Sequence, residues 1–130
     1  MRFEVHTQRR EQMLDVTAEI RQAVGRSEVK HGMVLIYCPH TTAAVTVNEA
    51  ADPDVPADII GGLATLVPRD GTWQHREGNS DAHLKATLVG ASVTVPVVDG
   101  KLTLGTWQGV FLCEFDGPRT RSLVVSVCEG

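Results

Sequence analysis

The chain has 130 residues, of which 42% are hydrophobic and 22% charged, and this composition is that of one ordinary globular domain spanning residues 1–130. Its net charge of −4 at pH 7, with no basic run, argues against a nucleic-acid or membrane-surface partner and favours a small molecule. The N-terminus lacks an apolar signal core, and no apolar run approaches the roughly 20 residues of a membrane helix, so we expect a cytoplasmic protein.

Hydrophobic periodicity predicts alternating strands and helices along the chain. The first half is expected to contain strands at residues 2–7, 33–38 and 43–48, and helices at residues 12–24, 55–67 and 81–89. Four strands should follow, at residues 92–98, 101–105, 108–115 and 121–128. Asp99-Gly100 is typical of a type I′ hairpin turn. Hairpins near the C-terminus indicate a largely antiparallel β-sheet with helices packed on one side, which is an α+β fold.

The segment WQHREGNSDAHL is the densest polar stretch of the chain, and it indicates a site rather than a core. If residues 75–79 are extended, His75, Glu77 and Asn79 point to one side, because side chains of an extended chain alternate. Any one of these residues is more often a solvated loop side chain than a ligand-binding one. The density of the cluster favours a binding function for all three.

The helix that follows this segment adds candidates at its N-terminus. Ser80 is a good N-cap, and Asp81 and His83 fall in the first turn, beside free backbone N–H groups and the positive end of the helix dipole. Such a position favours a phosphate or another anion. Because Asp81 would repel an anion, we expect it to face a bound cation or a neighbouring histidine, or else simply to stabilise the helix dipole.

Polar side chains also follow two predicted strands. His40, Thr41 and Thr42 come directly after an apolar strand, a place where a rigid scaffold commonly holds catalytic and binding groups. Asn48 and Glu49 end the next strand, so if the two strands pair, at least one strand length separates the two polar patches. Whether the patches meet in one subunit is left open by the sequence.

Three histidines are candidate ligands for zinc or another divalent metal ion. His40, His75 and His83 match no metalloprotease spacing such as HExxH, but three neutral imidazoles around one open position suit a catalytic metal. A carboxylate such as that of Glu49 or Asp81 would then orient a ligand or serve as general base. This pattern is compatible with a metal-dependent hydrolase or a phosphatase-like enzyme.

Four blocks carry a resemblance to a known family: DPDVPADI before the central helix, HTTAAVTVNE at 40–49, HREGNSDAHLKATLVGAS at 75–92 and LTLGTWQGVFLCEFDGPR at 102–119. Over nearly the whole chain they resemble the YjbQ family, small proteins often called secondary thiamine-phosphate synthase enzymes. The resemblance implies an α+β homotrimer with polar clefts between subunits. It also implies a weak coupling of hydroxymethylpyrimidine pyrophosphate with thiazole phosphate, which need not be the physiological role.

That reaction displaces pyrophosphate, so its site must stabilise the charge that develops on the leaving group. Arg119 or Arg121 would supply a cationic side chain, and the helix start at residues 79–83 would supply N–H donors. Dedicated enzymes for this reaction are barrels of about 250 residues, so a shared activity here is convergent or incidental. Two alternatives stay open: the metal-dependent hydrolase, and a non-catalytic trimer that binds a metal or a phosphorylated metabolite.

Overall fold

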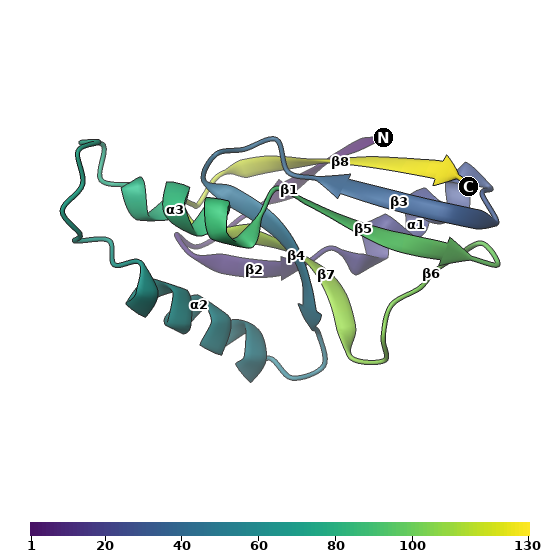
Figure 1. Cartoon of the computed structure of the whole chain (residues 1–130), viewed down its shortest axis with the longest axis horizontal. Helices are drawn as coiled ribbons and strands as arrows, with labels where there is room; N and C mark the ends of the chain where they lie inside the picture. The colour runs from purple at the N-terminus through teal and green to yellow at the C-terminus, as the bar shows by residue number, and fades with distance from the viewer.

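The computed structural model describes all of residues 1–130, as two antiparallel β-sheets and three helices (Figure 1). The larger sheet has five strands in the order β1-β8-β3-β5-β6, and the smaller has three in the order β2-β7-β4. The strands are β1 (Arg2–His6), β2 (Gln12–Asp15), β3 (His31–Tyr37), β4 (Ala43–Glu49), β5 (Ser92–Val98), β6 (Lys101–Leu102), β7 (Gln108–Glu114) and β8 (Thr120–Glu129). The helices are α1 (Thr17–Ser27), α2 (Asp54–Leu66) and α3 (Ser80–Val89). The predicted α+β class with antiparallel strands is confirmed.

The main core is formed by α1 and the facing sides of the two sheets. Alternation along β3 buries Val34 and Ile36 against this core and leaves Met33, Leu35 and Tyr37 exposed on the outer face. Strands β4, β5, β7 and β8 add buried valines and leucines to the same cluster. The five-stranded sheet therefore has one buried face, whereas its outer face carries large apolar side chains into solvent.

A second, smaller core lies on the other face of the three-stranded sheet and positions α3. Ala44 of β4, Cys113 of β7 and Phe115 pack against Ala82 of α3, and all four are buried. Small side chains at Ala44 and Ala82 let the helix approach the sheet closely. Because α3 is anchored through its first turn, residues near that turn are held by a rigid support.

The structure shortens the helix predicted at residues 12–24 and decides a strand pairing that the sequence left open. The expected helix at residues 12–24 begins only at Thr17, because Gln12–Asp15 form β2 and pair with β7. Asp15 Oδ1 accepts a hydrogen bond of 2.9 Å from the Thr17 backbone N–H, which marks the start of α1. The strands expected at 33–38 and 43–48 do not pair with each other, since β3 and β4 belong to different sheets.

Helix α2 is the least embedded element of the chain. It packs through Ile60 and Leu63 beside Met13 of β2, yet none of its residues is buried. Leu66 at its C-terminal end is 75% exposed. None of the three helices has the length and apolar character needed to cross a membrane. Helix α2 is thus only partly covered by its own chain and keeps apolar surface exposed to solvent.

Candidate functional site

A pair of histidine rings forms the centre of the candidate site. His75 lies in the loop before α3 and His83 in the first turn of α3, with ring centroids 5.5 Å apart in an edge-to-face arrangement. Ser80 Oγ lies 3.4 Å from His75 Nδ1, and Glu77 Oε1 lies 3.7 Å from His75 Nε2. The structure thus brings together four of the side chains that the sequence grouped, although residues 75–79 form a loop rather than a strand.

His40 follows β3, and a backbone contact fixes its tautomer. Its Nε2 accepts a hydrogen bond of 2.9 Å from the backbone N–H of Ser122. A neutral imidazole that accepts at Nε2 carries its proton on Nδ1. Burial, together with the nearby Arg121 guanidinium, lowers the pKa of His40 below its ordinary value of 6.5, so the ring is neutral at pH 7. His40 therefore presents an N–H donor.

His40 and His83 line one open hollow of about 420 Å³ between the start of β4 and α3. Thr41 and Thr87 add hydroxyl groups, and the remaining wall consists of small residues. These are Ala43, Ala86, Gly90 and Ala91. No carboxylate lines the hollow, so its polar groups are imidazoles and hydroxyls. The Thr87 hydroxyl donates to the His83 carbonyl at 2.9 Å, so the side-chain donors left for a ligand are those of His40, His83 and Thr41. An anion meets these donors without facing a like charge.

The histidines of a single chain do not fit a metal ion. Nowhere in the chain do three His, Cys, Asp or Glu side chains converge in a group that could hold one. With Nε2 of His40 engaged and Nδ1 protonated, His75 and His83 are the two predicted ligands that keep a lone pair available. A zinc site takes at least three protein ligands. Within one chain, His75 and His83 therefore supply only two of the protein ligands that a zinc site requires.

Asp81 is a buried ion-pair partner in the structure. Its carboxylate lies 3.0 Å from Arg10 Nη2 and 2.8 Å from Lys85 Nζ, and Lys85 also pairs with Glu11. Burial by itself would raise the pKa of Asp81, but the hydrogen bonds from Arg10 and Lys85 outweigh it and lower the pKa to about 2. Both oxygens are occupied and weakly basic, so the predicted role of general base is replaced by a structural one.

Thr42 belongs to a second buried charge cluster rather than to a ligand site. Its Oγ1 accepts a hydrogen bond of 2.7 Å from Arg121 Nη2, and Arg121 Nε lies 2.9 Å from Glu114 Oε1. The same Glu114 oxygen accepts a bond of 2.8 Å from the Thr7 hydroxyl. Arg121 directly precedes the residue whose N–H binds His40. The cluster therefore anchors the segment that orients His40, and Arg121 is not free for a ligand.

Asn79 and Arg119 meet at Asp116. Asn79 Nδ2 donates to Asp116 Oδ2 at 2.9 Å, and Arg119 Nη2 donates to the same oxygen at 3.2 Å. Asn79, and not Ser80 as predicted, is the N-cap of α3, and its side chain makes no capping bond. These two predicted ligand-binding residues are thus joined to each other through Asp116, which was not among the predicted site residues.

Asn48 and Glu49 lie at the far end of β4 from the histidines. The strand runs over seven residues from Ala43. At about 3.3 Å per residue it separates Glu49 from Ala43, which lines the hollow together with His40 and His83, by roughly 20 Å. The structure therefore does not bring the predicted Glu49 base to the histidines within one chain.

Comparison with known proteins places the chain in a family. The family described as UPF0047 protein YjbQ-like matches residues 1–130. The chain belongs to the UPF0047 family. The UPF0047 protein MJ1081 of Methanocaldococcus jannaschii is 50% identical over 126 residues, which cover 97% of this chain and 91% of the relative. The UPF0047 protein YugU of Bacillus subtilis is 44% identical over 130 residues, with 96% of each chain covered.

Solved structures of the UPF0047 family have the same fold. A family member from Clostridium acetobutylicum superposes with a TM-score of 0.97 at 45% identity, covering 98% of this chain and 99% of that one. A YbjQ-like protein of unknown function from Sulfolobus solfataricus gives a TM-score of 0.96 at 36% identity, and the match covers 100% of this chain and 96% of that one. The predicted family and fold are confirmed by these relatives.

Proposed function

We propose that this UPF0047 protein is an enzyme that binds the phosphate or pyrophosphate group of a small metabolite in the hollow between His40 and His83. The observation that carries this proposal is the polar lining of the hollow, two imidazoles and two hydroxyls without a carboxylate. His40, with its proton on Nδ1, is a donor that does not change charge near pH 7. His83 lies in the first turn of α3, where the helix dipole favours negative charge.

The proposed reaction is the displacement of pyrophosphate, the class to which thiamine-phosphate synthesis belongs. The thiazole nitrogen supplies the electron pair for the new C–N bond, while the C–O bond to pyrophosphate breaks and its electron pair leaves with the oxygen. Stabilising the charge on that oxygen is the main task of the site. Since Arg121 is buried against Glu114 and Arg119 is paired with Asp116, we assign this task to His40 and His83.

We further propose that the working unit is the homotrimer that the family resemblance implies. Two observations support a partner chain: the apolar α2 buries none of its residues, and β3 exposes Met33, Leu35 and Tyr37 on the outer face of the sheet. A cyclic trimer brings two different surfaces of neighbouring chains together. Glu49, which lies far from its own histidines, would in that arrangement be free to complete a neighbour's site.

Product formation distinguishes this proposal from a non-catalytic binding role. Purified protein would be incubated with hydroxymethylpyrimidine pyrophosphate and thiazole phosphate, and thiamine phosphate and pyrophosphate would be measured together. We expect equal amounts of the two products. Losing one leaving-group donor, in His40→Gln or His83→Asn, should lower kcat by about 100-fold. The matched control is His31→Gln, because that ring lies on β3 and is 65% exposed.

Two other outcomes are informative. If pyrophosphate binds in a calorimeter and no product forms, the non-catalytic alternative is favoured over the enzyme. If pyrophosphate does not bind, or if it binds His40→Gln and His83→Asn as tightly as the wild-type chain, the proposed site is refuted.

A further inference from the structure

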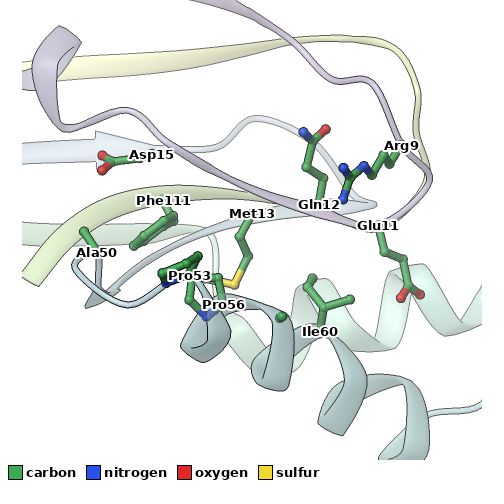
Figure 2. Close-up of a pocket in the computed structure, with 11 residues that line it drawn as sticks. Arg9, Glu11, Gln12, Met13, Asp15, Ala50, Pro53, Pro56, Ile60 and Phe111 are labelled. Atoms are coloured by element: carbon green, nitrogen blue, oxygen red, sulfur yellow. The ribbon is translucent and has the colours of Figure 1, made fainter.

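A second cavity, a groove of about 510 Å³, lies between β2, α2 and β7 (Figure 2). It shares no lining residue with the histidine hollow. Its middle is apolar and is formed by Met13, Pro53, Pro56, Ile60 and Phe111. Its volume falls within the range of about 300 to 1,000 Å³ that is usual for small-molecule pockets. The groove is therefore large enough for a small organic ligand, and it is separate from the proposed phosphate site.

Charged and amide groups lie at the two ends of the groove. Figure 2 shows Arg9, Glu11 and Gln12 gathered at one end, and Asp15 at the other end. The apolar residues, Phe111 among them, lie between these ends. A ligand that fills the groove therefore meets an apolar surface along its body and polar groups at its tips.

The hydrogen-bond partners of these polar groups decide which ligand chemistry fits. Glu11 Oε1 accepts from Lys85 and Arg10, Gln12 Oε1 accepts from the Gln8 N–H at 2.9 Å, and Asp15 Oδ1 accepts from Thr17. The Glu11 carboxylate is therefore paired with two cations, whereas Asp15 has only neutral partners.

The hydrogen-bond donors at the Arg9 end of the groove have no partners. The Arg9 guanidinium forms no ion pair or hydrogen bond in the chain, and it is exposed to solvent. The amide N–H₂ of Gln12 likewise has no partner, since only its oxygen is bonded. Because the charge of Glu11 is paired with Arg10 and Lys85 while that of Arg9 is unpaired, this end favours a ligand group that brings acceptor oxygens and a negative charge.

We propose that this groove binds an amphipathic organic anion. The carboxylate or phosphate of the ligand accepts hydrogen bonds from Arg9 and Gln12. Its apolar body packs against Met13, Ile60 and Phe111. A cationic head group is disfavoured at the Arg9 end, because it would face Arg9 while Glu11 is already paired with Arg10 and Lys85. The unpaired Asp15 carboxylate lies at the opposite end, away from the anionic head of the ligand.

Calorimetry on the full chain with 4-phenylbutyrate as the probe tests this proposal. Its neutral amide is the matched ligand, with the same apolar body and no charge. We expect the acid to bind more tightly than the amide. Arg9→Gln should weaken binding of the acid by roughly 10-fold, because it removes a charge-assisted hydrogen bond, and should leave binding of the amide unchanged. Arg21→Gln, an exposed arginine on α1 outside the groove, is the control.

A second variant separates a ligand from a neighbouring chain as the occupant. Ala57 is an exposed residue of α2 that lines the groove, so Ala57→Trp fills the groove without removing a buried contact. We expect it to abolish binding of both probes and to leave the mass in solution unchanged. Absence of binding by the wild-type chain, or equal binding of acid and amide, overturns the proposal. A fall in mass for Ala57→Trp, with no probe binding to the wild type, assigns the groove to a second copy instead.

Discussion

Replacing Asp81 by Asn removes the negative charge that Arg10 and Lys85 share in the buried cluster beside α3. The lowering of the Asp81 pKa from 3.8 to about 2 corresponds to roughly 2 to 3 kcal/mol of stability at pH 7. Breaking a buried ion pair by removing one partner typically costs about 3 to 5 kcal/mol. Because Lys85 keeps Glu11 as a partner, we expect Asp81→Asn to lower the free energy of unfolding by about 2 to 4 kcal/mol.

Urea unfolding at pH 7, followed by circular dichroism at one fixed protein concentration, measures this loss. Asp54→Asn is the matched control, because Asp54 also lies in the first turn of a helix and is exposed. A carboxylate that interacts only with the helix dipole contributes about 0.3 to 1 kcal/mol to the free energy of unfolding. If Asp81→Asn costs no more than Asp54→Asn, the ion-pair account of Asp81 is refuted.

The pH dependence gives an independent check on the partner of Asp81. The pKa of this carboxyl is lower in the folded chain than in the unfolded one, so its contribution is complete above about pH 4 and is lost as the pH falls towards 2. The stability difference between wild type and Asp81→Asn should therefore be constant from pH 8 to 5 and shrink below about pH 4. A difference that changes mainly between pH 5 and 8 would point to a histidine partner instead.

Three further outcomes follow from the structure. Glu114→Gln leaves the Arg121 guanidinium buried without its carboxylate, so the free energy of unfolding measured in urea should fall by about 3 to 5 kcal/mol. A fall of less than about 1 kcal/mol would contradict the pairing. An NMR titration of His40 should give a pKa below 6.5. Because the folded chain resists protonation of this ring, the contribution of neutral His40 to the free energy of unfolding should decline as the pH falls from 6.5 towards the measured pKa. A pKa of 6.5 or above contradicts the buried neutral ring. Light scattering should give three times the chain mass of 14.1 kDa, and Leu35→Lys should reduce it, whereas a wild-type mass of 14.1 kDa at micromolar concentration refutes the trimer.

The sequence predicted those elements whose pattern comes from burial. Alternation and continuous apolar runs located β3, β4, β5, β7 and β8, because these strands face the core. The turn at Asp99-Gly100 was also predicted, and the positive φ angles of 52° and 73° confirm its type I′ character. Strand β2 was missed because Met13 and Val16 satisfy helical spacing, and only pairing with β7 makes the segment extended.

The grouping within the site was predictable only where residues are close in sequence. His75, Ser80 and His83 were found together because one loop and one helical turn hold them. The partners of Asp81 were missed, since Arg10 lies 71 residues away and is brought close only by tertiary packing. For the other buried cluster the sequence held one signal, because Glu114 ends an apolar strand, and a charge directly after a buried run indicates a buried partner, here Arg121.

The central claim is that His40 and His83 together receive a phosphate group, and a pyrophosphate titration followed by NMR tests it most directly. The ring C–H resonances of both histidines should shift and saturate at the same pyrophosphate concentration, while the exposed His31 does not move at constant pH. If neither resonance of the pair shifts, or if His31 shifts as much as they do, the hollow is not a specific phosphate site and the account is contradicted.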